Sequence, residues 1–363
     1  MLGALSSSAL AADFLSTENP ANAGVATGVY LDGQAFFGSD IVPLVRVNKD
    51  WSQGFHPRDG KNYALISTRI EAGMQWKSFR LGYIERNEWL GSANRDSLDV
   101  VRADRQKLDY DNGRNYSLDY RLRGFAADGA RLTKSFSNEL GSGWNLRWGG
   151  AASMLRGRRV RSEDIHGNAT ATGGRNYTAS VEWTRDYSHT NMIADGFIDT
   201  FQNGNPSGQG YAADFGLTFT RQDGLRFEWI ASDVLGRMNW SDIPEKTLSG
   251  SNLPGAALPG GRKLRVDLEQ HLPVKHALSV TIPTAVADIE LGDTLFQSIH
   301  LPRVGLAKRL GANWMARIDY DFRFSTIGLG VSYRWFYLNA RSDTLSVNKA
   351  RAFGLGLGAR LEF

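Results

Sequence analysis

Apolar and polar residues alternate along most of this 363-residue sequence. In residues 66–76 the even positions are mostly apolar, whereas the odd positions carry Arg69, Glu71 and Gln75. Successive side chains of a β-strand point to opposite faces, so a period of two predicts a strand with one apolar and one polar face. The same pattern recurs in residues 79–83, 116–123, 144–148, 177–183, 211–220, 225–229, 264–269, 314–323, 327–337 and 352–363. The sequence therefore predicts an all-β protein.

The alternation continues to the last residue. In residues 352–363 the odd positions are apolar up to Phe363, and the even positions from Gly354 onward are glycine, arginine or glutamate. A final aromatic residue with apolar residues two and four places before it resembles the C-terminal signal of Gram-negative outer-membrane β-barrel proteins. The alternative for this segment is an ordinary amphipathic edge strand. The resemblance implies a barrel in the bacterial outer membrane, assembled by the outer-membrane machinery through its last strand.

The residues on the two faces favour a membrane barrel over a soluble sandwich. The polar faces carry clusters of arginine, aspartate and glutamate, and the apolar faces are rich in tryptophan, tyrosine and phenylalanine. Lipid-facing and lumen-facing residues alternate in this way in a transmembrane β-barrel. Aromatic residues gather where the membrane meets water, and the candidates for this girdle are Trp76, Trp335, Tyr337 and Phe363. We predict an all-β, transmembrane, antiparallel up-and-down β-barrel.

Turn spacing predicts the number of strands. Short turns are expected at 77–78, 111–113, 139–142, 188–189, 223–224, 273–274 and 324–325, and longer external loops at 157–174, 202–207, 236–261 and 339–350. Outer-membrane barrels have short periplasmic turns and longer external loops. Counting back from a periplasmic C-terminus separates the two sets if residues 98–110 and 287–299 are both strands. This predicts about 16 strands, within a range of about 14–18.

Composition excludes several kinds of site and is compatible with a membrane barrel. Cysteine is absent, which excludes disulfides, thiolate metal sites and a cysteine nucleophile. The charge of +4 is the balance of 42 basic and 38 acidic side chains, so no footprint for nucleic acid is expected. Mean hydropathy is −0.34. No apolar run approaches the roughly 18 residues of a membrane helix, but barrel strands expose only half their side chains to lipid.

The first residues suggest export. Leu2 to Leu10 is short and apolar, and the small residues Ala9 and Ala11 fit a signal-peptide cleavage site. We interpret residues 1–11 as a signal-peptide remnant, the alternative being a disordered start. Residues 12–363 then form a single barrel, in which residues 12–61 include a periplasmic or lumen-filling segment.

No motif points to catalysis, a cofactor or a metal. Ser298 and His300 share a strand face, but outer-membrane lipases and deacylases use the order His-x-Ser and a third partner is missing. Asp319 and Asp321 form a same-face pair flanked by arginines, which favours ion pairing over acid–base chemistry. Phosphate-loop, HExxH and EF-hand sequences are absent. We expect neither an enzyme nor a cofactor.

The polar face itself is the candidate site. The residues expected to line the lumen and set selectivity are Arg69, Glu71, Arg121, Arg123, Arg147, Arg265, Asp267, Arg317, Asp319, Asp321, Arg323 and Arg334. If the two signs of charge segregate to opposite walls, water and small solutes pass between them. If they pair across the lumen, they close it.

Two functions follow. The favoured one is a porin-like channel for passive diffusion of small hydrophilic solutes, anions in particular, because a barrel of about 16 strands is wide enough to hold water. The alternative is a closed barrel that anchors or assembles a surface or secretion complex through its external loops. The basic run Arg156, Arg158, Arg159 and Arg161 either attracts anions, binds lipopolysaccharide phosphates or is simply a solvated loop. Expected partners are outer-membrane lipid and lipopolysaccharide.

Overall fold

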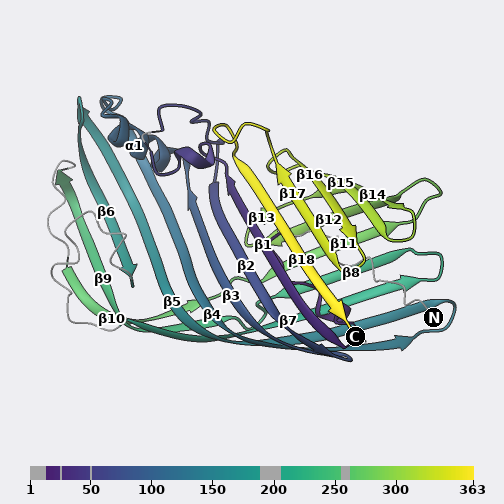
Figure 1. Cartoon of the computed structure of the whole chain (residues 1–363). Helices are drawn as coiled ribbons and strands as arrows, with labels where there is room; N and C mark the ends of the chain where they lie inside the picture. Colours follow the sequence, from purple (N-terminus) through teal and green to yellow (C-terminus); the bar gives the residue numbers. More distant parts are fainter. Residues whose placement is uncertain (1–13, 25–26, 50, 189–205, 255–261) are drawn as a thin grey trace.

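The structure is a computed structural model of the chain and describes residues 14–24, 27–49, 51–188, 206–254 and 262–363. Within these residues, 18 strands form one antiparallel sheet that closes on itself, as Figure 1 shows. This confirms the predicted all-β barrel and its expected size. The proposed signal-peptide remnant lies outside the described residues.

In chain order, the described residues form the following strands, one α-helix and two short 3-10 helices. They are η2 (Pro20–Asn22), β1 (Gly28–Ser39), η3 (Leu44–Arg46), β2 (Asn62–Trp76), β3 (Phe79–Ala93), α1 (Arg95–Gln106), β4 (Asn115–Glu139), β5 (Trp144–Gly173), β6 (Asn176–Tyr187), β7 (Ser207–Arg221), β8 (Arg226–Ser232), β9 (Arg237–Pro254), β10 (Arg262–His271), β11 (Lys275–Ile282), β12 (Asp288–Phe296), β13 (Ile299–His300), β14 (Arg303–Leu310), β15 (Trp314–Asp321), β16 (Thr326–Tyr333), β17 (Phe336–Ser342) and β18 (Ala352–Glu362).

The ring closes between the first and last strands. β1 pairs with β18, where Gly28 lies opposite Glu362, and with β2, where Gly28 lies opposite Gln75. Neighbouring strands pair from β2 to β5, and the ring then continues through β7, β8, β11, β12 and β14 to β18. Because this sheet closes, the backbone polar groups of the ring are satisfied within the wall.

The wall is taller on one side than on the other. β5 has 30 residues, and its first half pairs with β7 while its second half pairs with β6. β9 and β10 continue this upper wall beside β6. On the other side, β14 and β15 have only 8 residues each. Figure 1 shows the long strands β4 and β5 on the side of α1 and the shorter strands β14 to β17 on the other side of the yellow β18.

The two faces of the wall carry the predicted residues. On β2, Ile70 and Met74 are 51% and 67% exposed, whereas Arg69 and Glu71, on either side of Ile70, are 7% and 3% exposed. On β18, Leu357 and Leu361 are exposed in the same way. Large apolar side chains therefore cover the outside of the barrel, and charged side chains are buried inside it, which is the arrangement a lipid environment requires.

Residues 98–110 are not the expected strand. Residues 95–106 form α1, which begins where the Asn94 side chain accepts a hydrogen bond of 2.9 Å from the backbone N–H of Ser97. Leu98 and Val101, three residues apart, pack with Trp51 on one side of the helix. A helical period was thus hidden inside a chain dominated by strands. Among the described residues, no helix is both long and apolar enough to cross a membrane.

Two of the expected external loops are strands. Residues 157–173 belong to β5, and residues 237–254 form β9. Above the apolar band both faces of a strand can carry charges, so the hydropathy alternation that marks a strand disappears there. The expected strand within 287–299 is confirmed as β12.

Several expected turns lie elsewhere. Residues 77–78 and 223–224 do connect adjacent strands. Residues 111–113 instead lie beside the end of β5, where the N–H of Gly113 donates to the carbonyl of Ala171. Residues 324–325 follow Arg323, which contacts Asp40, so this turn lies at the same end of the barrel as Asp40. Residues 273–274 connect β10, which pairs with β9, to β11, which pairs with β8. Turn residues mark a change of direction without showing at which end of the barrel it occurs.

Candidate functional site

A segment before the first strand lies buried against the inner face of the barrel. From Phe14 to Ala23 every side chain is buried except that of Glu18, which is half-buried. The segment contains the buried polar residues Ser16, Thr17, Asn19 and Asn22. Buried polar groups need hydrogen-bond partners, and the charged inner face supplies them. We refer to residues 14–24 as the inner segment.

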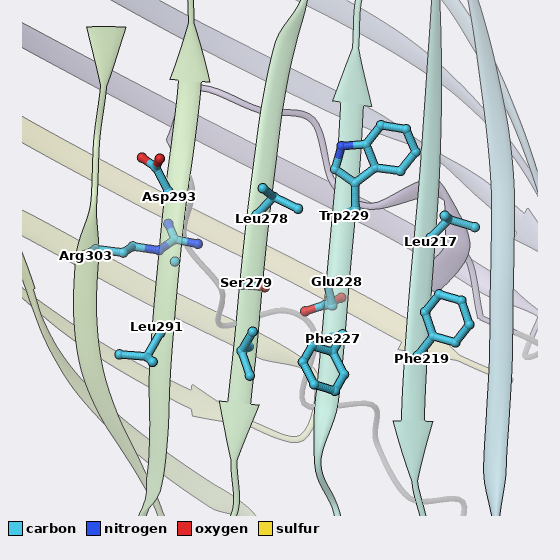
Figure 2. Close-up of a pocket in the computed structure, with 12 residues that line it drawn as sticks. Leu217, Phe219, Phe227, Glu228, Trp229, Leu278, Ser279, Leu291, Asp293 and Arg303 are labelled. Carbon is cyan, nitrogen blue, oxygen red and sulfur yellow. The ribbon is translucent and has the colours of Figure 1, made fainter.

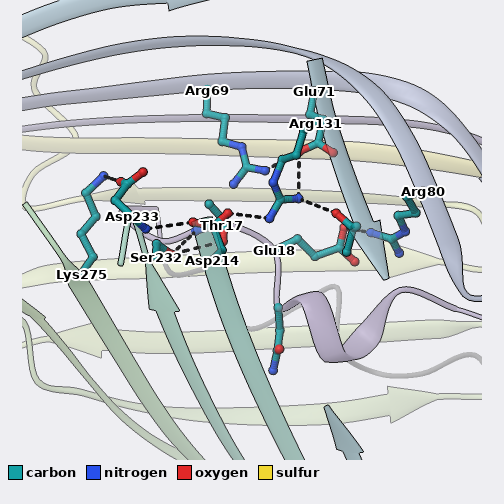
Figure 3. A network of polar contacts seen from close by, with 12 residues as sticks. Thr17, Glu18, Arg69, Glu71, Arg80, Arg131, Asp214, Ser232, Asp233 and Lys275 are labelled. Carbon is teal, nitrogen blue, oxygen red and sulfur yellow. Dashed lines mark hydrogen bonds and ion pairs between the residues drawn. The ribbon is translucent and has the colours of Figure 1, made fainter. Parts of the chain in front are cut away.

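Glu18 is the charged anchor of the inner segment. Its carboxylate accepts from the guanidinium of Arg80 on β3 and from that of Arg360 on β18, the latter at 3.1 Å. Burial by itself would raise the pKa of Glu18, but the two arginines outweigh it and hold the pKa at about 2. The carboxylate is therefore charged at neutral pH and ties the segment to two parts of the wall, as Figure 3 shows for Arg80.

Two asparagines hold the next turn of the segment. The Asn19 amide donates to the Thr218 hydroxyl at 3.1 Å and to the Glu228 carboxylate at 3.3 Å. The Asn22 amide donates to the same carboxylate at 2.8 Å. η2 fits closely because the wall here is glycine: a Cβ on Gly149 would lie 2.5 Å from the carbonyl oxygen of Pro20. The wall of β5 and β7 is thus shaped to receive this turn.

The start of the segment fills an apolar part of the lumen. The ring of Phe14 stacks on Phe36 with centroids 6.1 Å apart, and the guanidinium of Arg341 lies 5.2 Å from the same ring. A Cβ on Gly354 would lie 3.2 Å from the Phe14 ring, so the glycine row of β18 gives this ring its space. The remaining cavity beside Phe14 and Leu15 has a volume of about 10 Å³, room for about one water molecule.

The charges of the inner face are joined into networks. Arg131 on β4 contacts Glu71 on β2 at 3.4 Å and Asp214 on β7 at 2.8 Å, and Arg69 also contacts Glu71. Figure 3 shows this network beside Thr17 and Glu18. All four of these side chains are at least nine-tenths buried, so each charge depends on its partners.

Further networks lie beside it. Arg86 contacts Asp233 at 2.7 Å, and Lys275 contacts Glu88 at 2.6 Å. Arg317 contacts Glu290 at 2.7 Å, and Arg341 contacts Asp319. Acids and arginines intermix along the wall rather than occupying opposite sides. The structure thus holds paired charges, not the two segregated walls that were the other possibility.

The sequence-predicted lumen residues fall into three groups. Those buried on the inner face are Arg69, Glu71, Arg147, Arg317, Asp319 and Asp321, of which Arg147 is half-buried. Those near the upper rim are Arg121 and Arg123, which contact Asp164, and Arg323, which contacts Asp40. Three residues lie away from the lumen centre. Arg265 and Asp267 on β10 contact Asp242 on β9. Arg334, in the turn after β16, donates to Asn313 at 2.6 Å.

The proposed girdle needs one correction. Trp76, Trp335 and Phe363 are exposed at 61%, 50% and 83%. Tyr337 instead donates to Asp32 and packs on Gly358 on the inner face. Residues 327–337 are two strands joined by a turn at Arg334, where φ is 22°, rather than a single strand. The turn shifts the alternation, and Leu338 takes the outward position.

The residues that sequence reasoning missed are those of the inner segment. Residues 12–61 were expected to include a periplasmic or lumen-filling segment, but Glu18, Asn19 and Asn22 were not singled out. Arg80 and Arg360 lie on the polar faces of the predicted strands 79–83 and 352–363, and the sequence does not show which acid they meet. The sequence offered one signal for this segment. It is a polar stretch without alternation, and it lies between the apolar start of the chain and the first strand.

A hollow on the wall lies over β7, β8, β11 and β12 and has a volume of about 410 Å³ (Figure 2). Most of its lining is apolar and faces outward, including Phe227, Leu278 and Leu291, which are 40–54% exposed. Glu228 and Arg303 complete it from the inner face. The outward part of this hollow belongs to the apolar outer surface of the barrel.

Neither a metal centre nor a catalytic pair is built from the described residues. No group of three histidine, aspartate or glutamate side chains could hold a metal ion among them. Ser298 hydrogen-bonds to Tyr63, and His300 lies 3.2 Å from Asp293. Ser298 and His300 therefore have separate partners.

No protein-family model matches the chain, and no curated protein matches it. A TodX deltaS2S3 mutant monoaromatic hydrocarbon channel is similar, at 11% identity over 95% of this chain and 93% of that chain, with a TM-score of 0.47. The Pseudomonas putida toluene transporter TodX has 11% identity over 92% and 88%, with a TM-score of 0.36. The β domain of the Bordetella autotransporter BrkA has 12% identity over 93% and 100%, with a TM-score of 0.28.

Proposed function

We propose that this protein is a channel of the bacterial outer membrane for small hydrophilic solutes, closed at rest by its inner segment. An apolar outer surface and a charged inner surface on one closed sheet support the membrane location. The single observation that carries the gating is the double contact of Glu18 with Arg80 and Arg360. The inner segment contributes no strand to the ring, so it can leave the lumen without breaking the wall.

The proposed solutes follow from the inner surface. Charged and hydroxyl side chains suit water and small polar molecules, whose hydration they can replace. An anion preference would have to come from arginines, most of which contact acids. The candidate is Arg147, which lies on the inner face of β5 opposite Thr218 and next to the inner segment's binding site.

Planar-bilayer recording of the full chain tests the proposal. Wild-type protein should open rarely, and Glu18→Gln should open at least about ten times more often, since every loss of about 1.4 kcal/mol of contact changes an equilibrium tenfold. Glu362→Gln, on the same strand as Arg360, is the matched control and should behave as wild type. Silence from folded wild-type protein and from Glu18→Gln would contradict the channel.

A closed barrel that serves as an anchor is the second candidate. The observations that favour it are the ion-paired lumen and the upper wall of β5, β6, β9 and β10, which rises beyond the shorter strands. Such a wall would present a broad surface to a partner protein. A barrel that stays non-conducting after release of the inner segment, yet is needed for a surface structure to form, would favour this candidate.

A further inference from the structure

A bulge in β5 breaks its alternation on the outer face. Gly157 lies opposite Ala127 of β4 and Arg159 lies opposite Ala126, so Arg158 is an extra residue between them. An extra residue of this kind re-aims the side chains around it. Arg156 and Arg158 both contact Asp128, and Arg159 is two pairing positions from it on the same face. The bulge therefore gathers three arginines on one side of the wall.

This cluster lies where the apolar band ends. On the outer face of β4 and β5, Leu132 is 51% exposed and Met154, two residues before Arg156, is 78% exposed. The stretch from Trp144 to Met154 matches the roughly 9–11 residues that a tilted strand needs to cross a bilayer. Arg156 is thus the first outward-facing charge of β5 beyond the band, at the end of the barrel opposite the C-terminus.

Asp128 positions the guanidinium groups. It accepts from Arg156 Nη2 at 3.0 Å and from Arg158 Nε at 2.5 Å. The Asp128 side chain is 6% exposed, whereas those of Arg156 and Arg158 are 73% and 49% exposed. A guanidinium has five N–H donors in a fixed fork, so each arginine keeps donors that face outward. Glu85 lies opposite Asp128, and the three arginines still exceed the two acids in charge.

We propose that Arg156, Arg158 and Arg159 form a binding site for the phosphate of a glycolipid of the lipid A type. Guanidinium groups bind phosphate oxygens through paired, charge-assisted hydrogen bonds. A ligand at this position has to carry its phosphate at the membrane–water boundary and its acyl chains beside Met154 and Leu132, which a phosphorylated membrane lipid does. The inference rests on the proposed outer-membrane location and is independent of whether the lumen conducts.

Native mass spectrometry of the full chain in detergent tests this site, with phosphorylated lipid A and the same lipid stripped of its phosphates as probes. Wild-type protein should retain the phosphorylated lipid and lose most binding of the stripped lipid. The double variant R156Q/R158Q should bind about tenfold less. R221Q is the matched control, because Arg221 also pairs with an exposed acid, Asp223, but lies at the end of β7 opposite Trp144, the first residue of β5. It should bind as wild type.

A second variant separates a built site from general attraction to positive charge. Asp128→Asn adds net positive charge but removes the group that aligns Arg156 and Arg158, so binding should fall. Stronger binding by Asp128→Asn, equal binding of both lipids by wild type, or an unchanged R156Q/R158Q variant would each overturn the proposal. Channel recordings would be unaffected by any of these results, so failure here is distinguishable from failure of the channel.

Discussion

The carboxylate of Glu18 lies 3.1 Å from the guanidinium of Arg360, which is 342 residues further along the chain. The contact joins the inner segment to the last strand, so the complete anchor needs β18 in its place in the ring. Arg80 on β3 contacts the same carboxylate and completes the anchor.

The anchor makes stability depend on pH in the acidic range. The pKa of Glu18 is lowered from 4.5 to about 2 in the folded protein, because two arginines outweigh the effect of burial. A lowered pKa means that the stabilisation is complete above 4.5 and is lost as the pH falls toward 2. Thermal unfolding of wild type and Glu18→Gln should differ by a constant amount above about pH 5, roughly 3 kcal/mol for a buried ion pair. The difference in stability should shrink below that pH. A difference that does not depend on pH would contradict the role of Glu18 as a charged anchor.

Filling the recess under η2 should expel the inner segment. Gly149→Ala would place a Cβ 2.5 Å from the Pro20 carbonyl oxygen and 2.8 Å from that of Lys134 on β4, so the segment has to move away and the wall has to adjust. We expect this variant to open more often in bilayer recordings and to lose protease protection of residues 14–24. Gly150→Ala is the control on the same strand, because its nearest contact is an ordinary 3.7 Å. Equal behaviour of the two variants would mean that the recess does not hold the segment.

The effect of replacing Arg131 on stability should be coupled to the effects of replacing Glu71 and Asp214. Arg131→Gln leaves Glu71 and Asp214 without their shared cation in a buried setting, and breaking a buried pair of this kind costs roughly 3–5 kcal/mol. A double-mutant cycle with Asp214→Asn, measured by urea unfolding in vesicles, should give a coupling of at least about 1 kcal/mol. Strict additivity of the two variants would contradict the network.

Trp240 should be the most costly aromatic residue to remove. It is 2% exposed, and its ring covers Gly157 and Gly208, while its Nε1 donates to Gln270 at 3.3 Å. Trp240→Ala should lower the free energy of unfolding by about 3–5 kcal/mol through the cavity it leaves. Trp76→Ala, at an outer position 61% exposed, is the comparison and should cost less. An equal loss of free energy of unfolding in the two variants would contradict the buried packing of Trp240.

Much of the architecture was readable from the sequence. The alternation in residues 66–76 and 352–363 predicted β2 and β18 and their outward faces, because a strand places alternate side chains on opposite sides whatever its partners are. The same rule failed near Tyr337, where the turn at Arg334 shifted the alternation, and at residues 98–110, where a helix carries its own apolar side. Residues 157–173 were missed because a strand that stands in water carries charges on both faces.

The sequence by itself thus determined the fold class, the apolar outside and the charged inside of this protein. Only the tertiary structure decided that Glu18, Arg80 and Arg360 meet, that acids and arginines pair instead of segregating, and that the bulge at Arg158 gathers charges on the outer wall. The reason is physical. Which way a side chain points depends on local backbone geometry, whereas which charge it meets depends on strand register and ring closure, contacts between residues hundreds of positions apart.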